Sequence, residues 1–111
     1  GVFRERPGQV PRRVEGQSVR RQWHGVFDNG QIEYQGEFHT GKHDGWGTAY
    51  FENGQIKYQG GWKDNLYDGN GTEYFDNGQI EYQGEFHTGK HDGWGTAYFE
   101  NGQIKYQGGW K

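Results

Sequence analysis

Histidine and aspartate recur together in this chain, and they are the side chains that could bind a metal ion. His39, His43 and Asp44 flank a Thr-Gly pair, and an identical set returns 48 residues later. If Thr-Gly forms a turn, the two histidines approach each other across a hairpin. Zinc requires three or four ligands with supporting hydrogen bonds, yet the intervening segment has Lys63 and Tyr67 at the histidine positions. We therefore predict no metal or cofactor site and expect these histidines to be solvent-facing turn residues.

A catalytic site has even less support in the sequence than a metal site. Every carboxylate belongs to a column that repeats along the chain, whereas an active site is a single asymmetric pocket with perturbed groups. The regularly spaced hydroxyls of Thr48, Thr72 and Thr96 have no histidine at a recurring position near them. Gly45-Trp46-Gly47 lacks the Lys-Ser/Thr pair that follows a phosphate-binding loop. We predict that the chain is not an enzyme.

Binding of a partner molecule is the function that remains, and aromatic and basic residues are the side chains suited to it. Trp46 and Trp94 each stand between two glycines on the polar face of an expected strand, where an indole could contact a protein, a glycan or a lipid surface. Residues 1–22 carry a charge of +4 and the rest of the chain −7, so an arginine-rich segment could bind an acidic partner or anionic lipid. Nucleic acid is disfavoured, because the arginines are scattered and no stacking platform accompanies them. The candidate interaction surface is Trp46, Trp94, Arg12, Arg13, Arg20 and Arg21.

A 24-residue repeat must position all of these residues. The decapeptide FENGQIKYQG at residues 51–60 recurs from residues 27, 75 and 99, with only Asp/Glu and Glu/Lys exchanges. A fixed period of this size indicates a repeat architecture. Each copy contains Asn-Gly, which is typical of a two-residue hairpin turn of type I′ with positive φ at both residues. Second turns are expected at Thr40-Gly41 and Asp64-Asn65, so each repeat is two strands of about eight residues.

Alternation along the strands predicts one face of aromatic rings lying over glycines, which explains why glycine is tolerated inside strands. With Asn53-Gly54 at the tip, the predicted pairs are Phe51 with Ile56, Ala49 with Tyr58, and Gly47 with Gly60. The same alternation places Glu73 on the aromatic face, unless a β-bulge near Gly71 puts Tyr74 there instead. The structural positions of the repeat are Tyr34, Tyr58, Tyr82, Tyr106, Phe38, Trp62, Phe86 and Trp110, with turn glycines Gly54 and Gly78.

The segments YQGEFHTGKHDGWGTAYFENG and YQGGWKDNLYDGNGTEYFDNG resemble MORN repeats. That family has Tyr-x-Gly-x-aromatic, a polar turn, a Gly-x-Gly-Thr strand and an Asn/Asp-Gly turn. The resemblance covers residues 34–111 clearly and 23–33 in part, with Asp44-Gly45 in place of the usual His-Gly. It implies an all-β protein, an elongated antiparallel sheet of stacked β-hairpin repeats, and a role as a scaffold for protein assembly. Lipid binding is also attributed to the family.

Length and composition set the domain organisation. Only 29% of the 111 residues are hydrophobic, but 18% are aromatic and 22 are glycine, which favours a thin sheet with an aromatic core over a deep globular one. There is no cysteine, so no disulfide framework is expected. We predict a basic Arg-rich arm over residues 1–9, a degenerate capping repeat over 10–33, and repeats over 34–111 with the last one incomplete. We therefore expect the chain to be a piece or a processed form of a longer repeat protein, or a designed sequence.

The function predicted from these observations is a non-enzymatic repeat scaffold that mediates protein–protein interaction or self-assembly. Open sheet edges expose unpaired N–H and C=O groups and so favour a homo-oligomer or a filament. Two alternatives stay open, a glycan or cell-wall binding module that uses the aromatic rings, and an anionic-membrane binding module that uses the arginines. A right-handed β-helix is the alternative fold, which the Asn-Gly reversals disfavour.

Overall fold

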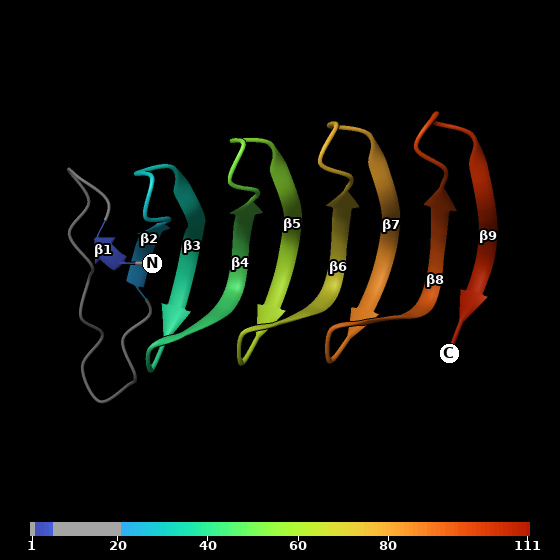
Figure 1. The fold of residues 1–111 in the computed structure, drawn as a ribbon. Helices are drawn as coiled ribbons and strands as arrows, with labels where there is room; N and C mark the ends of the chain where they lie inside the picture. Colours follow the sequence, from blue (N-terminus) through green and yellow to red (C-terminus); the bar gives the residue numbers. More distant parts are fainter. Residues whose placement is uncertain (1, 6–20) are drawn as a thin grey trace.

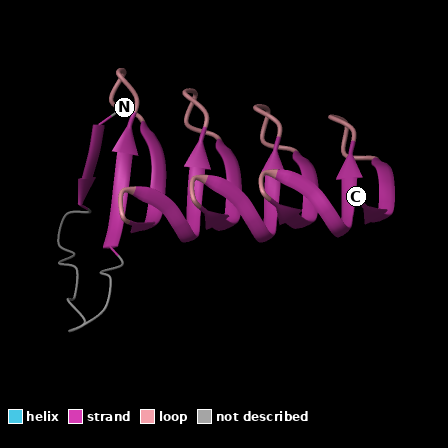
Figure 2. Cartoon of the chain, turned by 90° about the horizontal axis from the view of Figure 1, so that it is seen from below, coloured by secondary structure: helices cyan, strands magenta, loops and turns pink. Residues whose placement is uncertain are grey.

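The chain forms one open antiparallel sheet in which each strand pairs with the next in sequence (Figure 1). The computed structural model describes residues 2–5 and 21–111, with side chains from residue 25 onward. The described residues contain no helix (Figure 2), so the predicted all-β sheet of consecutive hairpins is confirmed and a β-helix is excluded. The nine strands of this part are β1 (Val2–Glu5), β2 (Arg21–Val26), β3 (Ile32–His39), β4 (Lys42–Tyr50), β5 (Ile56–Lys63), β6 (Leu66–Tyr74), β7 (Ile80–His87), β8 (Lys90–Tyr98) and β9 (Ile104–Trp110).

The arm predicted over residues 1–9 includes β1, which pairs with β2. Residues 6–9 of that arm lie outside the described residues, as do residues 10–20 of the predicted capping repeat. The domain boundaries proposed from sequence therefore stay predictions.

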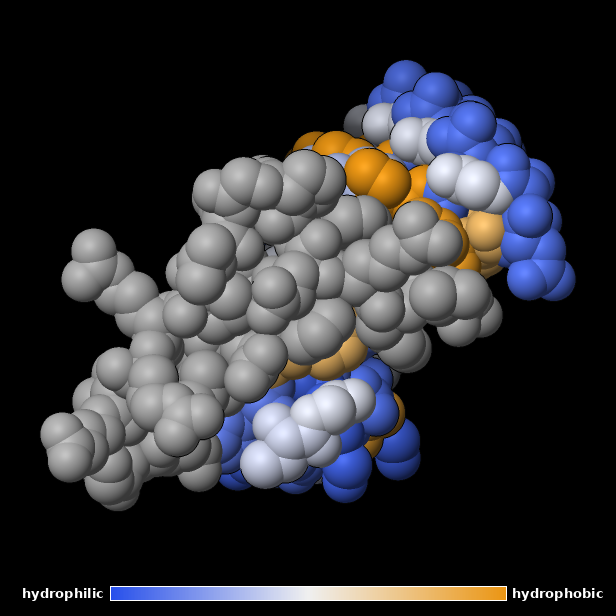
Figure 3. All heavy atoms as spheres, turned by 90° about the vertical axis from the view of Figure 1, so that its left-hand side faces the viewer, coloured by the Kyte–Doolittle hydropathy of each residue, from blue (hydrophilic) through white to orange (hydrophobic). Residues whose placement is uncertain are grey.

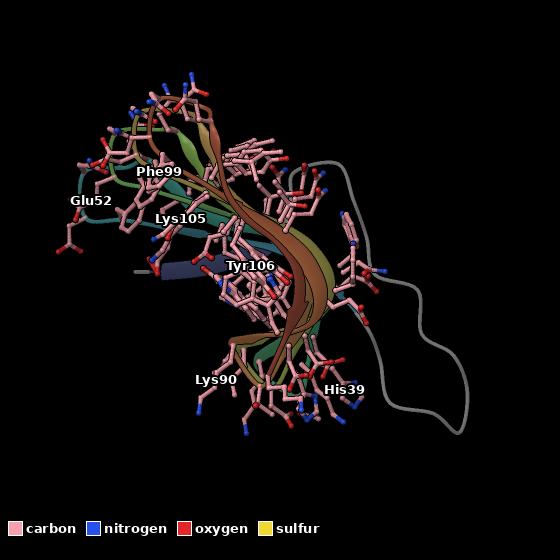
Figure 4. All side chains as sticks on the ribbon, turned by 90° about the vertical axis from the view of Figure 1, so that its right-hand side faces the viewer. His39, Glu52, Lys90, Phe99, Lys105 and Tyr106 are labelled. Atoms are coloured by element: carbon pink, nitrogen blue, oxygen red, sulfur yellow. The ribbon has the colours of Figure 1, made fainter. Side chains whose placement is uncertain are left out.

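The strands bend along their length, so that the sheet has a concave and a convex face (Figure 4). Tyr106 lies inside the curve in that view, and the other tyrosines of its column occupy the equivalent strand position. We call the concave face, with its rows of aromatic rings, the aromatic trough. The opposite surface is the convex face.

The Asn-Gly loops close hairpins, but not with the turn predicted from sequence. In the loop of residues 51–55, Gly54 N–H donates to Phe51 O over 3.0 Å and Phe51 N–H donates to Gln55 O over 2.8 Å. The central residues of this turn are thus Glu52 and Asn53, and only Gly54 has positive φ (+90°). The loop is therefore a three-residue connection, a type I turn followed by a left-handed glycine, and the predicted type I′ turn at Asn-Gly is wrong.

The asparagine side chain provides the physical reason for this difference. Asn53 Oδ1 accepts the N–H of Gln55 at 2.9 Å, which holds the asparagine at the end of a right-handed turn instead of in the left-handed region. Its amide Nδ2 also donates to Asp76 O at 3.1 Å in the neighbouring loop. Asn29 makes the same internal contact through Gln31 N–H at 2.9 Å.

Type I′ turns occur instead at the opposite end of the hairpins. Thr40 and Gly41 have φ of 50° and 80°, and Asp64 and Asn65 have φ of 50° and 70°. Each pair is the whole connection between two strands, because His39 pairs with Lys42 and Lys63 pairs with Leu66. The second turns expected from sequence are therefore confirmed.

Strand register follows the prediction except next to the three-residue Asn-Gly loops. Ala49 pairs with Tyr58 and Gly47 with Gly60, as predicted, but Tyr50 pairs with Ile56 where Phe51 was expected. A bulge beside Ala49 causes the shift, since Lys57 stands as an extra residue in β5. The equivalent bulge between β6 and β7 lies beside Glu73, where Glu81 stands as the extra residue in β7. The predicted irregularity near Gly71 is also present, since the register of β5 and β6 shifts there. Glu73 nevertheless pairs with Tyr58 and stays on the concave side, so the predicted replacement by Tyr74 is wrong.

Candidate functional site

Three tyrosines form the floor of the aromatic trough. Tyr34, Tyr58 and Tyr82 are completely buried, although the sheet has only one layer. Each ring lies flat over a glycine of the next strand, where a Cβ atom would collide with it. The covered glycines are Gly47 under Tyr34, Gly71 under Tyr58 and Gly95 under Tyr82.

The tyrosine hydroxyls bind the backbone of a bulge. Between Gly60 and Trp62 the register shifts, which leaves Gly61 outside the regular ladder of β5 and β6. Tyr58 Oη donates to Gly61 O at 2.7 Å, and Tyr34 Oη donates to Glu37 O at 2.9 Å. A buried carbonyl that loses its ladder partner needs such a donor. Burial raises the pKa of both tyrosines above the ordinary value, so the hydroxyls stay protonated donors.

A second ring stacks on each tyrosine from the following strand. His43 is parallel to Tyr34 with ring centroids 3.7 Å apart, Tyr67 to Tyr58 at 3.8 Å, and His91 to Tyr82 at 3.7 Å. Phe38, Trp62, Phe86 and Trp110 meet these stacks edge-on. Parallel and edge-on contacts therefore alternate along the trough and join the repeats into one core.

Two histidines were therefore assigned wrongly from sequence. His43 and His91 are half-buried members of the ring stacks, not solvent-facing turn residues. Desolvation lowers the pKa of His43 to about 4, so the ring is neutral at pH 7. The signal was present in the sequence, because Tyr67 occupies the same repeat position. Among the described residues no group of three His, Asp or Glu side chains is placed to hold a metal ion.

Glu73 is an acidic residue on the aromatic face, and it has a partner there. His91 Nε2 lies 3.0 Å from Glu73 Oε1, with both side chains about three-quarters buried. Burial, and after it the charge of Glu73, raises the pKa of Glu81 on the next strand. The two unequal halves of the 48-residue unit are thus complementary, since the carboxylate of one contacts the histidine of the other.

The trough opens into a groove of about 420 Å³ across β3–β6. Trp62 and Tyr67 line it together with Leu66, whose side chain is 46% exposed. Glu33 and Lys57 add one charge of each sign. Figure 3 shows hydrophobic residues between hydrophilic rims where the described surface is visible from the β1 side.

The convex face has a different chemistry. Trp46 and Trp94 are 56% and 63% exposed, and they lie opposite the tyrosine row because each precedes a glycine that a tyrosine covers. A row of glutamine and threonine runs beside them across the sheet. Gln59 Nε2 donates to Thr48 Oγ1 at 3.2 Å, and Gln107 Nε2 donates to Thr96 Oγ1 at 3.1 Å. This amide–hydroxyl row was missed in the sequence, where it shows only as the Gln of Tyr-Gln-Gly and the Thr of Gly-Thr in each repeat.

The predicted basic site is mostly outside the described residues. Arg12, Arg13 and Arg20 are not described, and Arg21 begins β2 without a described side chain. The anionic-membrane alternative depends on these arginines and stays a prediction. No described residues form a helix long and apolar enough to span a bilayer.

The fold is that of a β-repeat protein. Its curved hairpins follow one another in sequence order, and aromatic rings packed between successive repeats join them. The family model for the MORN repeat variant matches residues 47–64, 67–87 and 95–111, which together make up half of the chain. The chain therefore belongs to the MORN repeat family. Repeats of this family are generally non-catalytic modules of protein or membrane interaction. No curated protein matches the chain.

Proposed function

We propose that this chain is a non-enzymatic scaffold that binds a segment of a partner protein in the aromatic trough. The observation that carries the proposal is the groove over β3–β6, which is lined by the rings of Trp62 and Tyr67 and by the exposed apolar side chain of Leu66. Buried aromatic and aliphatic contacts with charges at the margin are typical of surfaces that anchor a partner side chain.

Leu66 makes this part of the trough distinct from its repeats. The equivalent positions are Lys42 and Lys90, so the central repeat replaces a charged wall by an apolar one. Glu33 and Lys57 come from bulges on the opposite side of the groove. A suitable partner segment has an apolar anchor flanked by charges of both signs.

Selection of peptides tests the proposal with a variant that the fold already accepts. A library of random peptides is selected on the whole chain, and the selected peptides are titrated by calorimetry against wild type, Leu66→Lys and Glu52→Ala. Leu66→Lys reproduces the residue of the neighbouring repeats and is expected to weaken binding at least about tenfold, because a buried charge opposes an apolar anchor. Glu52 is exposed in the loop of residues 51–55 (Figure 4) and is not among the residues that line the groove, so Glu52→Ala is expected to bind like wild type.

Equal affinity for Leu66→Lys, or no selected peptide at all, would reject the trough as the binding site. Self-assembly through sheet edges stays a prediction, which light scattering over a range of concentrations tests separately.

A further inference from the structure

The convex face holds two identical exposed indoles that the trough does not use. Trp46 on β4 and Trp94 on β8 are four strands apart, about 19 Å at the usual strand spacing. Asn70 occupies the equivalent position on β6 between them. The face therefore repeats the order Trp, Asn, Trp along the sheet.

A hollow lies beside Trp46, on the strands β4–β7 that lie on the side of Trp94. It measures about 340 Å³ and is lined by Trp46, exposed amides and a hydroxyl, with the backbone of two glycines at its base. The polar lining consists of Gln59, Asn70, Thr72 and Gln83. Amides and hydroxyls both donate and accept hydrogen bonds, so this lining can match a ligand rich in hydroxyl groups.

The charges beside the indoles exclude anionic ligands. Glu37 Oε2 accepts the backbone N–H of Trp46 at 2.8 Å, and Glu85 Oε2 accepts the backbone N–H of Trp94 at 2.7 Å. Among the described residues, no lysine or arginine lines the hollow. A phosphate, a nucleic acid or an anionic lipid would meet like charge here, whereas a hydroxyl can donate to either carboxylate.

A protein partner also fits this face poorly. The core of a protein interface is a contiguous apolar patch from which charge is depleted. Here the indole of Trp46 lies among amides, a hydroxyl and a carboxylate. A sugar ring suits such a surface, because its C–H face packs on an indole while its hydroxyls bind the polar groups around it.

We infer that the convex face binds a neutral polysaccharide, with Trp46 and Trp94 as two stacking platforms for one chain. A polymer of identical sugars is the ligand that can contact equivalent residues separated by a fixed distance. Two linked contacts bind more tightly than either one alone, so loss of both indoles is expected to cost more than loss of one.

Affinity electrophoresis in gels that contain a soluble polysaccharide tests this inference. The gels contain hydroxyethylcellulose, galactomannan, dextran or the anionic polygalacturonate. Wild type is expected to be retarded by at least one neutral polymer and not by polygalacturonate. Trp46→Asn and Trp94→Asn copy Asn70 and so suit the fold. The double variant is expected to lose about tenfold or more in affinity, and each single variant less.

Phe99→Ala is the control, since Phe99 is 49% exposed but lies in the Asn-Gly loop between β8 and β9, outside this face. It should migrate like wild type, as should Leu66→Lys, which alters only the trough. Circular dichroism of each variant confirms that the sheet is kept. The inference is overturned if no neutral polymer retards wild type, if polygalacturonate retards it equally, or if the double variant is retarded as strongly. Loss of a selected peptide in the double variant, without any polysaccharide effect, would assign the face to protein binding instead.

Discussion

A buried tyrosine in a single-layer sheet needs a neighbour without a side chain. Tyr58 meets this condition because Gly71 on the adjacent strand leaves its ring room to lie flat, with the hydroxyl bonded to Gly61 O. The ring and the glycine therefore form one structural unit that spans two strands.

Gly71→Ala is expected to destabilise the chain by about 1–3 kcal/mol, because the new methyl group collides with the Tyr58 ring. Gly109→Ala is the matched control, since nothing lies within 4 Å of a Cβ at that strand position. Its effect should stay within about 0.5 kcal/mol, as for other surface substitutions. Urea denaturation followed by tyrosine and tryptophan fluorescence measures both. Similar midpoints for the two variants would show that ring–glycine packing does not stabilise the sheet.

His43 predicts a pH dependence of stability with a defined sign. Its pKa is about 4 in the folded chain because of burial, against an ordinary 6.5. Below pH 6.5 the unfolded chain takes up a proton that the folded chain does not bind until about pH 4. Stability from this residue is therefore complete above pH 6.5, is lost as the pH falls toward 4, and changes no further below that.

His43→Tyr isolates this contribution, because Tyr67 already makes the same stack in the next repeat and burial raises its pKa to about 12. The melting temperature of wild type should fall more than that of His43→Tyr between pH 7 and pH 4. Carboxylates titrate in both proteins, so the difference between them reports on His43. Parallel curves would mean that the imidazole is protonated in the folded state without cost.

At the scale of elements, the sequence predicts most of the architecture but not the geometry of every turn. Period, strand length and the ring face follow from local patterns, since alternation and glycine spacing act within one hairpin. The turn at Asn53-Gly54 depends on a side-chain bond to Gln55 N–H and on a contact with the next loop. Neither interaction has a signature in residue type alone, because Asn-Gly suits both loop types.

Some residues of the candidate sites were predicted from the sequence and others were not, because some depend on local patterns and others on contacts between strands. The exposure of Trp46 follows from alternation, which is a local property. The stacking of His43 on Tyr34 requires two strands to be brought into register, and a bulge shifts that register by two residues. Leu66 is recognised as part of a groove only in the folded sheet, where residues of β3–β6 line the groove together.

Gly54→Ala tests the revised loop. Gly54 has φ of +90° and no close neighbour that would collide with a Cβ, so any loss comes from the backbone. Left-handed geometry costs an L-residue about 1–2 kcal/mol, and the variant should lose about that much in urea denaturation. Asn53→Ala separates the two loop models. It should also destabilise, because it removes the bond to Gln55 N–H, whereas a loss confined to Gly54→Ala would contradict the side-chain explanation.

At the scale of the whole molecule, the described hairpins pack chiefly against their neighbours in the sequence. Rings from one repeat pack against the next, and the loops are linked through Asn53 Nδ2 and Asp76 O. Stability in such an array is a sum of repeat terms and nearest-neighbour interfaces. The 48-residue unit is the true period for charge, since the Glu73–His91 pair joins unlike halves and each half alone lacks one partner.

Insertion of a second copy of residues 51–98 after Tyr98 is therefore expected to lengthen the sheet without changing its cross-section. Both junctions reproduce the Tyr-Phe step of the native repeats, so no new local geometry is required. Four further strands should extend the sheet by about 19 Å and raise the melting temperature, because the added interfaces outnumber the added ends. Small-angle scattering measures the length and the cross-section separately.

An insertion of residues 51–74 alone is the control, because it places two like halves side by side and disrupts the alternation of the Glu73 and His91 positions. It should stabilise less per residue, and equal stabilisation would show that the two halves are interchangeable.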